Sequence, residues 1–205
     1  MLSSIKNIIF DLGGVVIDLD RDRCVESFTR VGFPDAEHLV DCYHPADFFN
    51  DLERGKLTKE EVYDIIREKA QKPISDEDIQ KAYGDILVEI PLYKLRLIES
   101  LRKRGFKTYA LSNINPIVID KVRELFTADG KQMEDYFDKA YLSYEVKSLK
   151  PDPEIFEILI ADSGINPEET LFIDDSDRNI MAGKEFGLQL YLAGDREDYS
   201  HLFEE

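Results

Sequence analysis

IIFDLGGVV, residues 8–16, is the stretch that decides the fold. Its apolar run is typical of a parallel strand that is buried on both faces. The run delivers the carboxylate of Asp11 into a glycine turn, and a buried carboxylate is costly unless it meets a cation, hydrogen bonds or a ligand. In open α/β sheets, ligands bind at the edge where such strands end. Asp11 is therefore a candidate site residue, provided that other polar groups gather beside it.

The composition bounds the class of protein. The chain has 205 residues, of which 43% are hydrophobic and 11% aromatic, enough for one domain with an insertion and a real core. The net charge of −17 argues against nucleic acid and anionic membranes as partners. No apolar run approaches the roughly 20 residues of a membrane span, and no signal peptide is seen. Cys24 and Cys42 share no metal-like spacing, so we expect reduced thiols and a cytoplasmic location.

Two kinds of pattern divide the chain. Residues 19–93 show helical patterning with little strand character, with helices expected near 35–43, 47–54, 59–71 and 76–87. Thr58 and Ser75, each followed by acids, have the pattern of helix N-caps. We therefore expect an all-helical insertion over 19–93 and a core made of residues 1–18 and 94–205.

The core alternates helices with strands. Helices are expected over 92–104, 116–126, 153–163 and 179–186, and strands over 106–111, 136–142, 170–173 and 189–192. This alternation predicts a Rossmann-like α/β fold with a parallel sheet and right-handed crossovers. The acidic tail, residues 195–205, is expected to dock as a short helix.

Several strands end in polar groups. Asp11 ends the first, Ser112-Asn113 the second, and Asp174-Asp175 a later one, while Lys150 precedes a crossover helix. The topology would gather these groups at one edge. Carboxylates from separate strands suit Mg²⁺, and a hydroxyl, a backbone amide and a lysine can hold phosphate oxygens. Asp11 is left as a nucleophile, because carboxylates form aspartyl phosphates.

Four motifs carry a family resemblance over almost the full length. They are FDLGGVV (10–16), LSN (111–113), LKPDP (149–153) and FIDDSDRN (172–179). With them the chain resembles a hydrolase of the haloacid dehalogenase (HAD) superfamily, in the branch of sugar-phosphate phosphatases near the N-terminal domain of soluble epoxide hydrolase. The resemblance implies a HAD-like core with a helical cap that closes over the site and selects substrates.

The resemblance also implies roles for single residues. Asp11 would be the nucleophile, Ser112 and Asn113 would bind phosphate, and Lys150 would steady both nucleophile and phosphate. Mg²⁺ would be held by Asp11, the carbonyl of Gly13 and Asp175, with Asp174 bound directly or through water. Asn179 would stand behind the acidic pair. The expected enzyme is a Mg²⁺-dependent phosphatase of a small phosphorylated metabolite, such as a sugar phosphate, and is a monomer or homodimer.

One position departs from the family. Most phosphatases of the superfamily carry a second Asp two residues after the nucleophile, which protonates the leaving oxygen, and here that residue is Gly13. General acid–base help is worth about 10²–10⁴ in rate. By position, Asp18, Asp20 and His44 are candidate substitutes, although a hinge or surface place suits each of them better.

Three alternatives follow from the same residues. A 2-haloacid dehalogenase also uses an Asp nucleophile and a lysine, but it needs no Mg²⁺ and favours an aromatic residue where Gly13 stands. A binding protein without catalysis is favoured only by Gly13, and a phosphoglucomutase would depend heavily on the missing acid.

Specificity is expected in the insertion and in the loop after Asn113. Tyr43, Phe48 and Phe49 could line a pocket there, or form the insertion's core.

Overall fold

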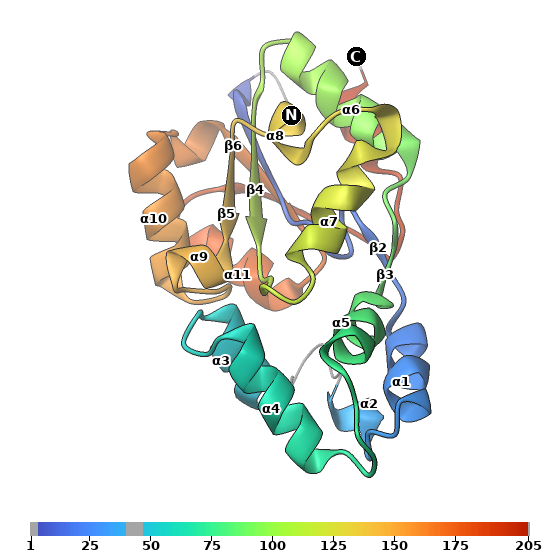
Figure 1. Cartoon of the computed structure of the whole chain (residues 1–205). Helices are drawn as coiled ribbons and strands as arrows, with labels where there is room; N and C mark the ends of the chain where they lie inside the picture. Colours follow the sequence, from blue (N-terminus) through green and yellow to red (C-terminus); the bar gives the residue numbers. More distant parts are fainter. Residues whose placement is uncertain (1–3, 40–46, 205) are drawn as a thin grey trace.

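The computed structural model describes residues 4–39 and 47–204, and within it a five-stranded sheet lies at the centre (Figure 1). The strand order is β5-β4-β1-β6-β7, and every neighbouring pair is parallel. The strands are β1 (Asn7–Phe10), β4 (Lys107–Ser112), β5 (Lys139–Leu142), β6 (Thr170–Asp174) and β7 (Gln189–Leu192). The predicted α/β fold with a parallel sheet is confirmed.

Strand β1 occupies the middle of the sheet because both its faces are apolar. Ile8 and Phe10 face one hydrophobic core and Ile9 faces the other, and all three are fully buried. Phe10 pairs with Ala110 of β4 and with Ile173 of β6. This register brings the polar ends of the three strands to the same edge of the sheet.

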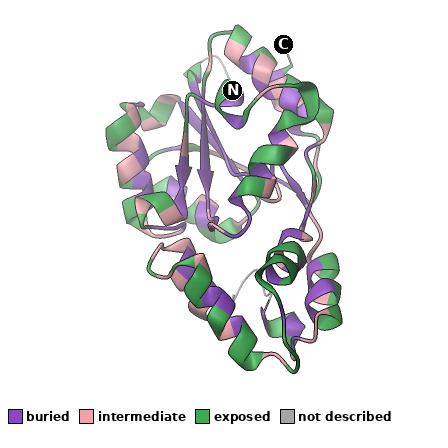
Figure 2. Cartoon of the chain, in the orientation of Figure 1, coloured by how far each residue is buried: buried purple, intermediate pink, exposed green. Residues whose placement is uncertain are grey.

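Helices cover both faces of the sheet. Helices α6 (Leu92–Lys103), α7 (Ile119–Phe126) and α8 (Met133–Tyr136) share the core of Phe10, and α10 (Pro153–Ser163) shares that of Ile9. Helices α9 (Ser143–Val146) and α11 (Asp177–Glu185) flank the strand ends (Figure 1). Figure 2 shows that the three inner strands, β4, β1 and β6, are buried almost throughout and that helices are exposed on one side. The tail ends in a 3₁₀ helix, Tyr199–Phe203, whose two end residues are buried, so it docks as expected.

Residues 21–84, called the inserted helices below, lie beyond the edge toward which the strands point (Figure 1). They are α1 (Arg21–Arg30), α2 (Ala36–Leu39), α3 (Asp47–Glu53), α4 (Lys59–Lys69) and α5 (Asp76–Gly84). The two predicted N-caps are confirmed: Thr58 forms a capping box with Glu61, and the Ser75 hydroxyl accepts a hydrogen bond from the amide of Asp78. Local sequence thus sets where α4 and α5 begin.

The end of the insertion differs from the prediction. The insertion was expected to be all helical, with a helix over 76–87, but residues 87–89 form β3 (Leu87–Glu89), which pairs antiparallel with β2 (Asp18–Leu19). Helix α5 stops at Gly84, and the amide of Asp20 donates to the carbonyl of Ile86 at 2.8 Å. The chain therefore returns beside the point where it left, and this long-range pairing overrides the local helical pattern.

Two further boundaries also differ. Helix α7 begins at Ile119 instead of residue 116, because Asn115 folds its side chain back to accept from the amide of Ile117 at 3.1 Å. The predicted strand over 136–142 begins only at Lys139, since residues 133–136 form α8. No helix in the described part of the chain is long and apolar enough to cross a membrane.

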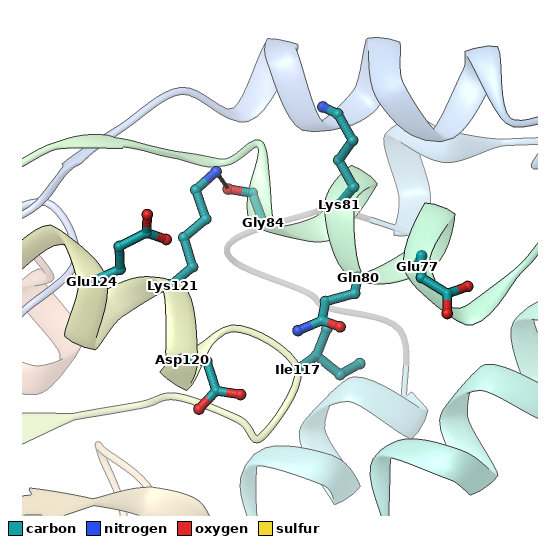
Figure 3. A pocket seen from close by; sticks show the side chains of 8 residues that line it. All are labelled: Glu77, Gln80, Lys81, Gly84, Ile117, Asp120, Lys121 and Glu124. Carbon is teal, nitrogen blue, oxygen red and sulfur yellow. Dashed lines mark hydrogen bonds between the residues drawn. The ribbon is translucent and has the colours of Figure 1, made fainter.

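The inserted helices contact the core on two sides. On one side Arg54 forms an ion pair with Asp152, and Lys147 Nζ donates to the carbonyl of Gly55 at 3.2 Å. On the other side Lys121 of α7 donates to the carbonyl of Gly84 at 2.6 Å, at the edge of a recess between α5 and α7 (Figure 3). None of the residues that line this recess is a predicted site residue. The predicted chemistry therefore lies elsewhere along the seam.

Candidate active site

Asp11 lies at the centre of the polar groups that gather at the sheet edge. It directly follows β1, its amide donates to the carbonyl of Ile173 at 2.9 Å, and the residue is only 8% exposed. Lys150 reaches it from the loop before α10, with Nζ 3.0 Å from Asp11 Oδ2. The Lys150 side chain is fully buried. A lysine and an aspartate that are 139 positions apart in the chain therefore share one dry site.

Asp174 fixes the other side of this lysine. Its Oδ2 accepts a hydrogen bond from Lys150 Nζ at 2.6 Å. Its Oδ1 accepts from the amide of Ser176 at 2.9 Å and from Asn179 Nδ2 at 3.0 Å. Asp174 is completely buried, so these donors satisfy a carboxylate that water cannot reach. Asn179 contacts Asp174 from behind, as expected of its position in the sequence.

Asp175 is exposed and lies against the glycine turn. Gly14 has a φ of +76°, and a Cβ added there would lie 2.1 Å from Asp175 Oδ2. Residue 14 must therefore be glycine both for its backbone conformation and to let the carboxylate approach. Asp11, Asp174 and Asp175 each offer an oxygen within 4.8 Å of the others. Three carboxylates in this arrangement are the hard oxygen donors that Mg²⁺ requires, so the residues fit the ion.

The charges of this cluster act on one another. Burial raises the pKa of Asp11 to about 8, the negative charges of Asp174 and Asp175 add to this shift, and Lys150 opposes it. Burial and the charge of Asp174 also raise the pKa of Asp175. Burial alone would lower the pKa of Lys150, but the charges of Asp11 and Asp174 raise it above the usual value. The lysine therefore stays protonated, and the cluster favours a further positive charge.

The predicted phosphate-binding residues lie beside the lysine. Ser112 ends β4 and is buried at the same sheet edge. The side chain of Asn113 joins two loops: its Nδ2 donates to the carbonyl of Lys150 at 2.8 Å, and its Oδ1 accepts from the Lys150 amide at 2.8 Å. Because this side chain is committed to the Lys150 loop, Asn113 could offer a phosphate only its backbone amide.

The position of the missing acid is filled by an apolar side chain. A Cβ on Gly13 would lie 3.1 Å from Leu19 Cδ1, so a larger residue there requires Leu19 to move. Asp18 is bound by Lys94 Nζ at 2.9 Å, and Asp20 caps α1 by accepting from the amide of Arg23 at 3.1 Å. Both carboxylates are therefore engaged away from the nucleophile. His44, the third candidate substitute, lies outside the described residues, as do Tyr43 and Cys42.

The aromatic residues of the insertion pack together. Phe49 is buried and stacks on Tyr83 with ring centroids 4.6 Å apart, while Phe48 is partly buried beside it at 4.7 Å. Their packing matches the expectation that they form part of the insertion's core.

A different polar residue of the insertion, Glu53, was missed by sequence reasoning. It is the last residue of α3 and accepts a hydrogen bond from the side chain of Asn115, two residues beyond Asn113. Burial raises its pKa to about 7, with the Asn115 hydrogen bond opposing the shift. The only signal in the sequence was an acid at a helix C-terminus, where the helix dipole disfavours negative charge.

Comparisons with known proteins agree with this geometry. The family model for haloacid dehalogenase-like hydrolases matches residues 5–187. The D-ribitol-5-phosphate phosphatase of Bacteroides thetaiotaomicron is 42% identical over 188 residues, which cover 91% of each chain. A HAD family enzyme from Bacteroides thetaiotaomicron, solved with magnesium and inorganic phosphate, superposes with a TM-score of 0.91 at 44% identity, covering 98% of this chain and 100% of that one.

A second solved structure is also similar over its full length. A predicted HAD-like family hydrolase from Porphyromonas gingivalis has a TM-score of 0.90 at 35% identity, covering 99% of this chain and 100% of that one. The family model and these relatives together span the strand ends that carry the clustered acids and the lysine. The chain belongs to the haloacid dehalogenase-like hydrolases.

Proposed function

We propose that this protein is a magnesium-dependent phosphatase that hydrolyses a small phosphorylated metabolite, a sugar or polyol phosphate. The observation that carries the proposal is the cluster of Asp11, Asp174 and Asp175 around the buried ammonium of Lys150. Three carboxylates facing one lysine carry excess negative charge, which a divalent cation would offset. Relatives similar over more than nine tenths of the chain include a phosphatase of a polyol phosphate and an enzyme solved with magnesium and phosphate.

The reaction begins at Asp11. One oxygen of its carboxylate attacks phosphorus in line, the bond from phosphorus to the substrate oxygen breaks, and an aspartyl phosphate forms. Water then attacks this phosphorus, which releases inorganic phosphate and restores the carboxylate. Because Leu12 N donates to Asp11 Oδ1 at 2.6 Å and Lys150 holds Oδ2, the carboxylate is fixed before the substrate arrives.

The surrounding residues hold the nucleophile and the phosphate. Lys150 binds both the Asp11 carboxylate and the incoming phosphate oxygens, and Ser112 with the backbone amide of Asn113 holds the phosphate from the side of β4. Asp11, Asp175 and the Gly13 carbonyl would hold magnesium, with Asp174 direct or through water and Asn179 orienting Asp174. When bound, magnesium supplies positive charge that offsets the carboxylates and the phosphate.

Gly13 limits how the leaving oxygen gains its proton. Glycine has no group to donate, and Leu19 occupies the space into which a side chain at residue 13 would extend. Asp18 and Asp20 are bound elsewhere, so neither supplies the proton from its observed position. The proton therefore comes from water or from a residue outside these two, and the rate with poor leaving groups is lower for that reason.

The same proposal includes the domain division, the cellular location and the oligomeric state. The inserted helices act as a cap, with the division into a core of 1–18 and 94–205 and a cap of 19–93 supported by the strand pair β2–β3 at the crossing. A cytoplasmic location and a monomeric or homodimeric state stay predictions. Nucleic acid and membranes are not expected partners because the charge is −17.

One panel of assays tests the function. Phosphate release from p-nitrophenyl phosphate and D-ribitol 5-phosphate is measured with Mg²⁺ and with chelator, in wild type, Asp11→Asn and the exposed control Asp22→Asn. We expect release that requires Mg²⁺ and falls at least about 10³-fold in Asp11→Asn only. Release that persists in chelator would contradict the proposal. Halide release from 2-chloropropionate would favour a dehalogenase, and phosphate binding without turnover would favour a binding protein.

A further inference from the structure

Glu53 stands where the inserted helices contact both loops that carry the phosphate-binding residues. The next residue, Arg54, is ion-paired with Asp152, two positions after Lys150. Gly55 accepts from Lys147 on the same loop at 3.2 Å. The C-terminal end of α3 is therefore seated directly on the loop that brings Lys150 to the nucleophile.

Asn115 fixes Glu53 from the other loop. This residue is 1% exposed, and its Oδ1 is occupied by the amide of Ile117. Its Nδ2 donates to the hydroxyl of Tyr83 on α5 at 3.2 Å and to the carboxylate of Glu53. One amide of the core loop after β4 thus orients a carboxyl of α3 and a hydroxyl of α5. The three side chains form a polar cluster above the sheet edge.

The Glu53 carboxyl is unlike the acids of the nucleophile site. Burial raises its pKa, the Asn115 hydrogen bond opposes the shift, and no lysine or arginine among the described residues contributes to it. Arg54, its neighbour in sequence, is directed to Asp152. A carboxyl that is desolvated at a helix C-terminus and has only a neutral partner costs stability. Such a cost is typical of a group that serves a ligand.

We propose that Glu53, oriented by Asn115, binds the hydroxyl groups of the organic part of the substrate, and so selects polyol and sugar phosphates. The inference rests on the proposed function. A carboxylate repels a phosphate and accepts hydrogen bonds from neutral hydroxyls, so Glu53 suits the end of the substrate that is remote from phosphorus. The carboxyl selects by hydrogen bonds that an ester without hydroxyl groups cannot make.

Binding without turnover tests this assignment. The Asp11→Asn protein with Mg²⁺ is titrated calorimetrically with D-ribitol 5-phosphate and with inorganic phosphate, alone and combined with Glu53→Ala or Glu53→Gln. We expect Glu53→Ala to weaken the binding of D-ribitol 5-phosphate at least tenfold and the binding of inorganic phosphate less than twofold. Glu53→Gln should lie between, because its amide keeps one acceptor oxygen. Glu68→Ala, an exposed glutamate of α4, is the matched control.

Other outcomes would overturn the assignment. Equal weakening of the binding of both ligands would mean that Glu53 supports either the phosphate site or the fold. Thermal melting of each variant shows whether the fold is affected. The assignment would also be refuted if Glu53→Ala left the binding of D-ribitol 5-phosphate unchanged. The same holds if the parent protein bound D-ribitol 5-phosphate no more tightly than inorganic phosphate. The proposed function fails differently: the wild-type protein would then bind these ligands but release no phosphate from any ester.

Discussion

In the described part of the chain, the side chains of two lysines are completely buried, and they are used differently. Lys94 of α6 meets one acid, Asp18, with Nζ 2.9 Å from Oδ1, beside the β2–β3 crossing. Lys150 meets Asp11 and Asp174 at 3.0 and 2.6 Å, with Asp175 close to both acids. At the crossing one lysine is ion-paired with one aspartate, and the exposed Asp198 is a further charge that acts on the lysine. At the sheet edge three acids face one lysine, and a bound cation would offset the excess negative charge.

The comparison shows how the same costly feature serves structure in one place and chemistry in another. Burying an ion pair brings little net stability, but removing one partner leaves an uncompensated charge. A balanced ion pair can therefore hold the β2–β3 crossing in place, since its charges need no further ligand. An unbalanced cluster is favoured where a cation offsets the charge, and this difference separates the β2–β3 crossing from the candidate active site.

The largest effect is expected at the crossing. Lys94→Met should lower the free energy of unfolding by about 3–5 kcal/mol, because Asp18 stays buried without its partner. Urea denaturation followed by circular dichroism measures this change. Adding Asp18→Asn should restore part of the loss, since the stranded charge is then removed. A loss below about 1 kcal/mol would show that the pair does not lock the crossing.

The same substitution at the sheet edge should instead affect catalysis. Lys150→Met should lower kcat for p-nitrophenyl phosphate by about 10²–10³-fold, because a preorganised positive charge next to the phosphate is lost. Lys94→Met, corrected for the folded fraction, should stay within about threefold of wild type. If the two variants lose equal activity, the distinction between a structural and a catalytic lysine is wrong.

Glu53 provides a third case, a carboxyl with no cationic partner among the described residues. Its ordinary pKa of 4.5 is raised to about 7 in the folded protein. The unfolded chain therefore loses this proton first, and the stability that it contributes is complete below pH 4.5 and is lost as the pH rises to about 7. Glu53→Gln should remove this loss. Between pH 4.5 and pH 7.5, the free energy of unfolding of Glu53→Gln should therefore increase by roughly 2–3 kcal/mol relative to that of wild type.

Urea denaturation of wild type, Glu53→Gln and the control Glu68→Gln at the two pH values measures the Glu53 effect. Glu68 is exposed on α4, so its substitution should leave the pH dependence of stability as it is. If the free energies of unfolding of Glu53→Gln and wild type change equally between the two pH values, Glu53 ionises at its ordinary pKa in the folded protein. Its carboxyl is then more hydrated than its burial indicates.

The smallest effect separates two residues of the same motif. Asp175→Ala should raise the Mg²⁺ concentration that gives half-maximal activity at least tenfold, because a carboxylate of the ion's site is removed. Asn179→Ala should raise it less, since Asn179 contacts only the rear of Asp174. Magnesium titrations of initial rates measure both. Equal shifts would mean that the ion depends as much on the orientation of Asp174 as on Asp175.

Local chemistry explains why much of the fold and the site was predictable. The buried run before Asp11 could form only a strand covered on both faces, and Thr58 and Ser75 carry their own caps. Because parallel strands end at one edge, the polar residues after them had to meet there. The sequence therefore predicted that Asp11, Lys150, Asp174 and Asp175 would meet at this edge, and the structure brings these side chains together.

Only the tertiary structure decided how those residues divide the work. Asp174 and Asp175 are neighbours in sequence, yet one is enclosed by Lys150 and Asn179 and the other lies exposed against Gly14. Sequence reasoning likewise missed β3 and Glu53, because strand pairing and desolvation depend on residues that are far apart in the chain. The sequence by itself determined which groups reach the sheet edge, through local patterns. Their burial, partners and pKa values were decided by long-range packing, which no local pattern encodes.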